Sequence, residues 1–472
     1  MYLHLDSGLL YAILKAQFIP MAHKIVDDAI VRYQKILESV PYNNLEWTDA
    51  LTEKMKSHGM VVGVRLASPF LRPHFLTKKQ FELLTKNGQL LHSAIDRLES
   101  LALTQPALLQ RWELLPAERM LAGIHPGYPF PHVSCLMNAV IEQTSPRIRG
   151  MQSTSAAGLA YGEMLSDMFF DAGPVREFRK KQALTKLGGT KLLLSALLKA
   201  YKAYGGKRQP QMAILEFKQP FQTIDSAEYL VLCELFRKHG YQTELVNPEQ
   251  LDYRNGALSK GDYRIDLLFR AASLQEFLLR FDLSHPLVKA YREGKVCMVN
   301  SFRAELAQKP TMFCLLTDEV ITASFPLAER KAIAAMVPWT RTVAAGRTQR
   351  GPEQIDLPEY ISAHKDELIL LPNDSTGTLP VYDGPSTEQS AWDRAIKQAL
   401  RERYVVQQRI RPETSRFPVL FYGSMDYRDM QVQVHPHAML GEVKTATAHL
   451  SSAEGGFSTM QGAAPLYLLD TK

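Results

Sequence analysis

The chain has 472 residues, of which 46% are hydrophobic and 22% are charged. This balance is typical of a globular protein with two or three domains or one large mixed core. The net charge of +6 is spread along the chain without a basic stripe and interleaved aromatic residues, which argues against nucleic-acid binding. No stretch is long and apolar enough to cross a membrane. The four cysteines are widely spaced in apolar segments, so we expect buried thiols, a reducing compartment and a cytoplasmic protein.

The first 125 residues are predicted to be mainly helical. The N-terminal segment MYLHLDSGLLYAILKAQF has no basic leading part, so it predicts a core helix and not a signal peptide. Residues 76–103 keep apolar side chains at three- and four-residue spacing, which predicts a second helix. A Pro- and Gly-rich break follows at 125–134, and then a short strand.

The stretch GMQSTSAAGLAY (150–161) combines small residues and hydroxyl groups ahead of a predicted helix. Such a loop is a place where an anion or a metal-bound phosphate can sit, although it contains no carboxylate. A basic amphipathic helix is predicted over 190–207. We interpret it as a solvated face over a core in preference to a membrane-surface helix.

From about residue 210 the pattern changes to alternating strands and helices. The segment 211–248 reads as a β-α-β unit, and further strands are predicted at 263–271, 295–301, 366–372, 403–410 and 417–434, with a glycine-rich loop and a final strand at the end. The predicted fold class is therefore α/β with α+β elements.

The order of motifs in the C-terminal half resembles the circularly permuted ATP-grasp proteins, relatives of glutathione synthetase and glutathionylspermidine synthase. The motifs are LVKAYREGKVCMVNSFRAELAQKP, VPWTR, DELILLPND and AWDRAIKQALRERYVVQQRI. They match the family's VN strand with its downstream lysine, PWTR turn, VLKPND hairpin and YVVQ strand. STSAAGLAY is similar to the family's SPAGxGY segment. The resemblance covers most of the chain from about residue 60.

This resemblance implies an ATP-grasp-like, circularly permuted fold in which two α/β layers grip ATP. It also implies carboxylate–amine ligase chemistry through an acyl phosphate, with Mg²⁺ held by oxygen ligands. The expected regions are 1–125, a mainly helical N-terminal part; 126–208, an ATP-grasp-like segment with the former metal-binding loop; 209–300, an α/β substrate-type domain; and 301–472, the nucleotide lobe with the C-terminal strands.

Three residues keep family positions that contact the nucleotide. Lys309, after the VN strand, is a candidate phosphate contact; the alternative is a surface lysine before a helix that starts with Pro310. Arg270 matches a family arginine at a strand end, and the alternative is a solvated charge. Gln407 lies in the YVVQ strand that lines the adenine pocket in the family.

Other family positions are lost. Leu371 stands where the family has its ATP-binding lysine. In the hairpin that follows, only Gly377 remains of several glycines, while Leu379 adds bulk and Pro380 removes an N–H that could approach a phosphate.

The metal-binding positions are changed as well. The resemblance places Gly150 on the family's metal-binding glutamate and Gln152 on its asparagine. Near the C-terminus, Lys444 falls at a family arginine, as a weaker substitute for bidentate contacts, and Arg428 preserves some polar character. His435 and His437 could face one side of a strand as two metal ligands, but without a third ligand nearby a polar strand end is favoured.

Two functional hypotheses follow. In the first, the chain is a degenerate ATP-grasp protein, a pseudoenzyme that needs no cofactor and acts by binding a partner, such as a protein. In the second, it is an active amide-forming ligase with a rearranged Mg-ATP site, in which Lys309, Arg270 and a replacement residue hold the phosphates. ATP and Mg²⁺ are cofactors only in the second case. A third hypothesis is that the old cleft holds a different, less charged ligand.

Overall fold

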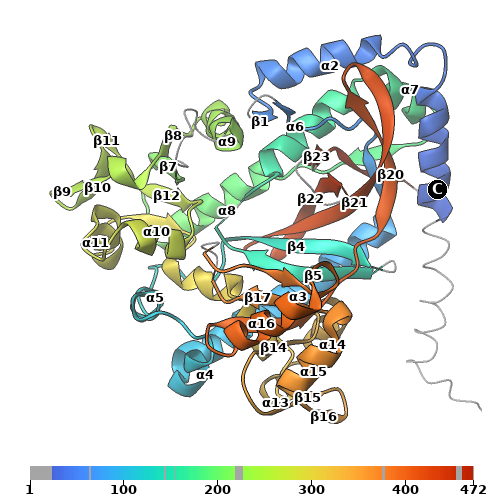
Figure 1. Cartoon of the computed structure of the whole chain (residues 1–472). Coiled ribbons are helices and arrows are strands. Elements are labelled where there is room, and N and C mark those ends of the chain that lie inside the picture. The colour runs from blue at the N-terminus through green and yellow to red at the C-terminus, as the bar shows by residue number, and fades with distance from the viewer. Residues whose placement is uncertain are drawn as a thin grey trace, which may run out of the picture.

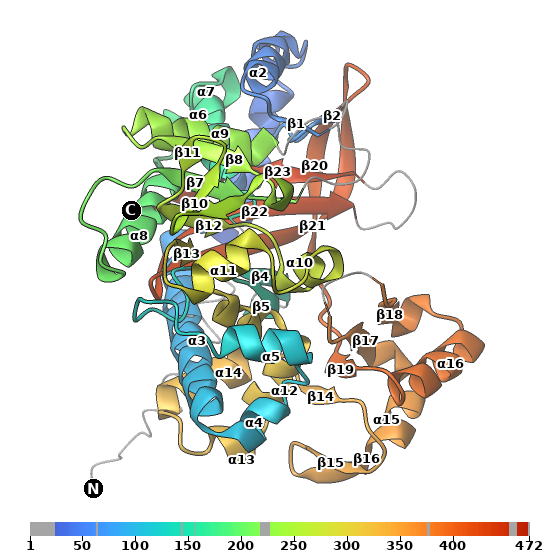
Figure 2. The same cartoon turned by 90° about the vertical axis from the view of Figure 1, so that its left-hand side faces the viewer.

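The computed structural model describes residues 24–62, 65–142, 145–154, 156–217, 227–374, 378–452 and 460–470. The predicted N-terminal helix and most of the predicted C-terminal glycine-rich loop lie outside these residues. The largest sheet is antiparallel, with strand order β23-β22-β21-β4-β5 and with β20 paired to β21 (Figures 1 and 2). Its strands are β4 (Ser134–Glu142), β5 (Ser145–Gln152), β20 (Thr414–Phe421), β21 (Ser424–Met439), β22 (Glu442–Ser452) and β23 (Gln461–Ala464).

Two parts of this sheet differ from the sequence prediction. The segment 417–434 forms two strands, because the chain reverses at Tyr422 and Gly423, which have φ values of 48° and 76°. A turn with two positive φ angles joins antiparallel strands tightly, and Tyr-Gly is a weaker sequence signal for it than Asn-Gly. The predicted loop from Gly150 also begins later than expected, since Gly150 to Gln152 still belong to β5.

One face of the large sheet is covered by helices. The prediction of a helix over 76–103 is confirmed by α3 (Lys78–Thr104), which begins with a capping box: Thr77 Oγ1 accepts from the Gln80 N–H at 3.2 Å, and the Gln80 side chain accepts from the Thr77 N–H at 2.8 Å. Leu91, Ile95 and other apolar residues of α3 are buried in one core with those of the sheet strands. The surrounding elements are α4 (Pro106–Gln110), α5 (Pro116–Ala122), η2 (Phe302–Gln308), α12 (Pro310–Leu316), α13 (Glu319–Thr322) and α14 (Leu327–Met336).

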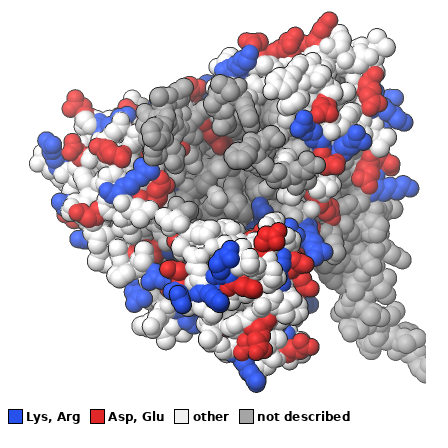
Figure 3. Space-filling view, viewed as in Figure 1, with Lys and Arg blue, Asp and Glu red and all other residues white. Residues whose placement is uncertain are grey.

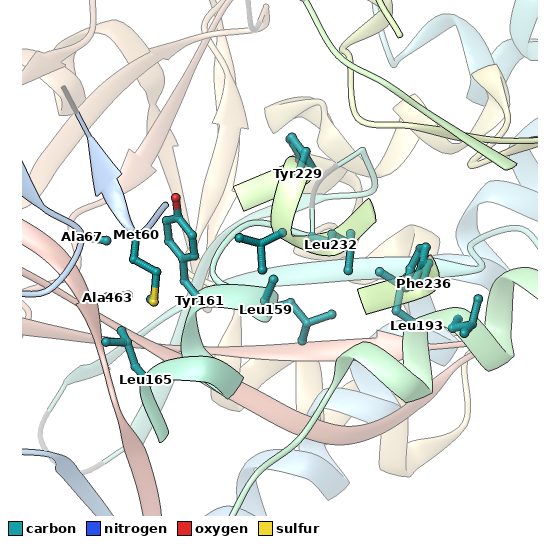
Figure 4. Packing of buried hydrophobic residues seen from close by; sticks show 14 of the residues in the cluster. Met60, Ala67, Leu159, Tyr161, Leu165, Leu193, Tyr229, Leu232, Phe236 and Ala463 are labelled. Carbon is teal, nitrogen blue, oxygen red and sulfur yellow. The ribbon is translucent and has the colours of Figure 1, made fainter. Parts of the chain in front are cut away.

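The opposite side carries α6 (Leu159–Phe170), which packs on β22 and β23. Leu159 lies among apolar side chains of neighbouring helices, with Leu193, Leu232 and Phe236 on one side and Tyr161 and Met60 on the other (Figure 4). These neighbours include α7 (Gly173–Arg179), α8 (Thr190–Ala203), α9 (Ala227–Lys238), α2 (Glu46–Ser57), a helix over 24–37, the pair β1 (Val61–Val62) and β2 (Arg65–Leu66), and the sheet of β3 (His74–Thr77), β24 (Leu466–Leu469) and β6 (Leu184–Lys186). The basic helix α8 buries its apolar side in this core, as expected of a solvated face over a core.

A parallel four-stranded sheet with the order β13-β12-β7-β8 confirms the predicted β-α-β unit. The strands β7, β12 and β13 are fully buried and mostly apolar, as parallel strands usually are. The elements are β7 (Met212–Leu215), β8 (Thr243–Val246), β12 (Leu267–Arg270), β13 (Cys297–Val299), α10 (Leu274–Arg280), α11 (Pro286–Arg292), η1 (Pro248–Gln250) and the small sheet β9 (Asp252–Arg254), β10 (Ala257–Lys260) and β11 (Tyr263–Arg264).

A smaller antiparallel sheet, β14-β19-β17-β18, lies beyond α12 (Figure 2). Its core holds the fully buried Trp392 and Tyr404. The elements are β14 (Thr340–Thr342), β17 (Leu368–Pro372), β18 (Tyr382–Asp383), β19 (Tyr404–Gln408), α15 (Leu357–Ala363), α16 (Gln389–Ala399), η3 (Lys365–Glu367), η4 (Gly384–Ser386) and the hairpin β15 (Arg347–Arg350) and β16 (Glu353–Asp356). The predicted mixture of helices and sheets is confirmed.

The distribution of surface charges and the burial of the cysteines agree with the sequence analysis. On the face shown in Figure 3, Lys and Arg alternate with Asp and Glu over the described surface, without a large patch of one sign. All four cysteines are buried and free, as predicted. Within the described ranges, no helix has the length and apolar character needed to span a bilayer.

Candidate functional site

A β-bulge places Arg149 on the side of the large sheet that faces away from α3. Ala139 pairs with Ile148 and Asn138 pairs with Gly150, so Arg149 is an extra residue between them. Ile148 and Met151 are both buried in the core that includes α3. A bulge changes the direction in which the side chains of a strand point. The extra residue lets both Ile148 and Met151 face the α3 core, while Arg149 points to the opposite face of the sheet.

Polar side chains of β21 and β22 share this face. Val432 and Val434 point into the core, so the alternating residues Gln433 and His435 point to the other side. Gln433 pairs with His449 on β22. We call the residues Arg149, Asn138, Gln433, His435 and His449 the polar face; each is half-buried except Arg149, which is exposed.

Hydrogen bonds fix part of the polar face. Arg149 Nη2 donates to Gln433 Oε1 at 3.3 Å, and the backbone N–H of Ala139, beside the bulge, donates to His435 Nδ1 at 3.3 Å. Burial, with the positive charge of Arg149 and the neighbouring His449, lowers the pKa of His435 to about 4. Burial also lowers the pKa of His449. Both imidazoles are therefore neutral at pH 7, and Arg149 is the cation of the polar face.

The two positions that the resemblance assigns to the metal lie on or beside this face. Gly150 is opposite Asn138, and a Cβ built on Gly150 would meet Asn138 Nδ2 at 3.5 Å, an ordinary contact. Packing therefore does not by itself demand a glycine there. Gln152 lies at the end of β5 opposite Leu136 and is half-buried. In the described residues, no group of three or more His, Cys, Asp or Glu side chains is arranged to hold a metal ion.

Lys309 is buried in an ion pair. Its side chain is 5% exposed, and Nζ lies 2.7 Å from Glu118 Oε1 and 3.4 Å from the carbonyl oxygen of Asn373. Glu118 is also buried, and its second oxygen accepts from the Leu115 N–H at the start of α5. The charge of Lys309 is thus balanced within the protein.

Arg270 has a similar environment in the parallel sheet. Its side chain is buried, and Nη1 forms an ion pair with Glu305. Nε donates to the carbonyl oxygen of Asn300 at 3.1 Å, and Nη2 donates to that of Ser301 at 3.0 Å. These bonds join the end of β12 to the turn after β13, so the guanidinium group has a structural role.

Gln407 occupies the middle of the small sheet. It pairs with Thr340 on one side and with Ile369 on the other, and Nε2 donates to Thr340 Oγ1 at 3.1 Å. Leu371, opposite Val405, is half-buried. Pro380 is exposed, and its carbonyl oxygen accepts from the Tyr404 hydroxyl. Gly377 lies outside the described residues.

The structure does not bring Arg428 and Lys444 together. Arg428 Nε is 3.0 Å from Asp426 Oδ2, and the guanidinium lies over the Phe421 ring near the β20–β21 turn. Lys444 forms an ion pair with Glu442 near the β21–β22 turn. These turns are at opposite ends of β21, so the two side chains are separated by about 30 Å at the usual rise of a strand.

A carboxylate missed in the sequence lies at the start of α6. Glu228 of α9 accepts from the backbone N–H groups of Gly158 at 2.9 Å and Tyr161 at 3.3 Å. Burial raises the pKa of Glu228 to about 7, although the backbone hydrogen bonds oppose this shift. The loop was predicted to hold an anion at a helix N-terminus, and an internal carboxylate occupies that position.

One known structure shares the fold of this chain over most of its length. A glutathione synthetase-like effector from Globodera pallida, solved in its apo form, is 10% identical to this chain over 90% of this chain and 96% of that one, with a TM-score of 0.59. A putative gamma-glutamylcysteine synthetase from Methylobacillus flagellatus is 12% identical over 82% and 86%, with a TM-score of 0.41. An ATP-grasp ligase, PsnB, solved with its minimal precursor, Mg and ADP, is 13% identical over 55% and 88%, with a TM-score of 0.26.

The likeness to the effector extends over nearly the whole of both chains, and the chain has an ATP-grasp-like fold. At 10% identity this likeness shows the fold alone. No family model matches the chain, and no curated protein is significantly similar to it. The circular permutation stays a prediction.

Proposed function

We propose that this chain is an ATP-grasp-fold protein related to ATP-dependent carboxylate–amine ligases that acts by binding and does not turn over Mg-ATP. The observation that carries this proposal is the pairing of its two candidate phosphate contacts with internal carboxylates. Lys309 is paired with Glu118, and Arg270 is paired with Glu305, with every one of these side chains at 8% exposure or less. Buried cations that are already paired with internal carboxylates offer less charge and fewer free N–H donors to a phosphate than exposed, unpaired ones.

The donor set of the sheet supports the same conclusion. Mg²⁺ takes oxygen ligands, and a phosphate-bound Mg²⁺ is usually held by one or two carboxylates. The described polar face instead presents neutral imidazoles, amides and the cation Arg149 around the position of Gly150. These residues do not fit the Mg²⁺ of a Mg-ATP complex, because no described side chain there supplies the missing carboxylate.

Calorimetric titration of the full chain with ATP, with and without Mg²⁺, tests the proposal. We expect no magnesium-dependent heat at millimolar ATP from a sample whose folding is verified by circular dichroism. Magnesium-dependent binding at micromolar affinity would overturn the proposal and favour the alternative, an active ligase with a rearranged site. A screen of carboxylate and amine pairs for ADP release would then identify its substrates.

A further inference from the structure

We propose that the polar face binds an anionic small molecule through a phosphate or carboxylate group, without a metal ion, and that Arg149 is the charged contact. This inference rests on the proposed binding function and names the chemistry of its ligand.

Arg149 differs from the other candidate cations in its charge balance. Lys309, Arg270, Arg428 and Lys444 each lie within ion-pair distance of a carboxylate. Among the described residues, Arg149 has no such carboxylate, and its hydrogen-bond partner is the neutral amide of Gln433. An arginine that is held in place but not neutralised is prepared for an anion from outside.

The bulge gives this arginine a defined position. Arg149 is left unpaired in the strand ladder, and such a bulge disrupts the neighbouring backbone hydrogen bonds. Beside the bulge, the Ala139 N–H donates to the side chain of His435. His435 therefore supports the bulge, and the Gln433 amide fixes one nitrogen of Arg149. A guanidinium has five N–H donors, so most of them stay available for a planar anionic group.

His449 supplies a second polar contact. It lies opposite Gln433 on the neighbouring strand, the same residue that contacts Arg149. No described residue forms a hydrogen bond with its imidazole. A neutral imidazole can donate one hydrogen bond without adding a charge, and a bound anion nearby would favour its protonated form. Binding is therefore expected to raise the pKa of His449.

The test uses the full chain in metal-depleted, chelator-free buffer at constant ionic strength, with and without added Mg²⁺. It is titrated with pyrophosphate and, separately, with the tricarboxylate tricarballylate. The two anions distinguish a phosphate from a carboxylate preference. The variants are Arg149→Gln, which removes the charge, and Arg149→Lys, which keeps it. Lys444→Gln is the matched control, since it removes a surface cation elsewhere on the same sheet. Calorimetry reports affinity, and NMR of labelled histidine reports the pKa of His449.

We expect one of the two anions to bind the native chain, with a loss of about tenfold or more in affinity for Arg149→Gln, as expected of a lost charge-assisted contact. Arg149→Lys should retain part of the affinity, and Lys444→Gln should bind like the native chain. The pKa of His449 should rise on binding in the native chain and not in Arg149→Gln.

Each contrary outcome has a distinct meaning. Absence of binding for both anions, or equal affinity of Arg149→Gln and the native chain, would overturn this inference and leave the proposed lack of Mg-ATP turnover intact. Binding that requires added Mg²⁺ would overturn both proposals together.

Discussion

The ion pair between Lys309 and Glu118 gives the sharpest test of whether Lys309 is a structural residue or a phosphate contact. The perturbation is Lys309→Met, which keeps the length and apolar stem of the side chain and removes its charge. In the folded protein this leaves Glu118 buried without its cation, 2.7 Å from the site of the lost ammonium group. A lysine reserved for a ligand would leave no such unpaired charge.

The expected magnitude follows from the burial of both partners. Removing one member of a buried ion pair typically costs about 3–5 kcal/mol, because the remaining charge is neither solvated nor paired. Replacing both members, in Lys309→Met with Glu118→Gln, removes the unpaired charge. Since the glutamine carbonyl of that substitution could still accept the backbone N–H of Leu115, we expect the double variant to be more stable than Lys309→Met.

Urea denaturation followed by circular dichroism measures these differences, with ATP calorimetry on the same samples. Lys444→Met is the control, since its partner Glu442 is on the surface, and it should leave the urea midpoint unchanged. A native urea midpoint for Lys309→Met, together with loss of an ATP-binding signal that the native chain gives, would refute the structural role of Lys309. That result would show a lysine available to phosphate and would favour an active nucleotide site.

Further predictions concern other buried charges. Arg270→Lys should lower the free energy of unfolding by about 2 kcal/mol or more in urea, because an ammonium cannot replace the planar fork that joins two backbone carbonyls; Arg428→Lys, at a partly exposed site, should not. Burial raises the pKa of Glu228 from 4.5 to about 7, so the folded state holds the extra proton and stability should fall as pH rises across this window; Glu228→Gln should remove that slope in thermal melts. Burial lowers the pKa of His132, but the carboxylate of Glu99, 3.0 Å away, outweighs this effect and raises it from 6.5 to about 9. The contribution of this pair should be complete below pH 6.5 and lost as pH rises towards 9, and His132→Asn should abolish that dependence.

Local patterns predicted the elements that depend on local physics. The helix over 76–103 follows from apolar spacing along one side, and its capping box is written in the sequence as Thr77 and Gln80. The β-α-β unit follows from apolar strands that flank an amphipathic helix. The reversal at Tyr422 and Gly423 was missed because Tyr-Gly is a weaker signal for a tight hairpin turn than Asn-Gly.

The bulge at Arg149 could have been predicted from the spacing of apolar residues in its strand. Ile148 and Met151 are three residues apart and both enter the core, whereas a regular strand buries every second residue. An apolar spacing of three within a strand therefore indicates an extra residue between them. No local pattern could place Gln433 and His449 beside it, because they come from strands distant in the sequence.

The partners of the candidate cations were also beyond reach of a sequence comparison. A motif can align Lys309 and Arg270 with ligand contacts of a family, but Glu118 and Glu305 decide by proximity in space whether those charges are available. Glu228 is a related case, in which the groups concerned are backbone donors. Its carboxylate accepts from N–H groups at the start of α6, where the sequence predicted an anion site. At all three positions a carboxylate of the chain lies where an anionic ligand was expected. Internal carboxylates thus balance the two cations that the resemblance predicted as phosphate contacts. Arg149 has only an amide for its partner, so it is the described cation at which we propose to test ligand binding.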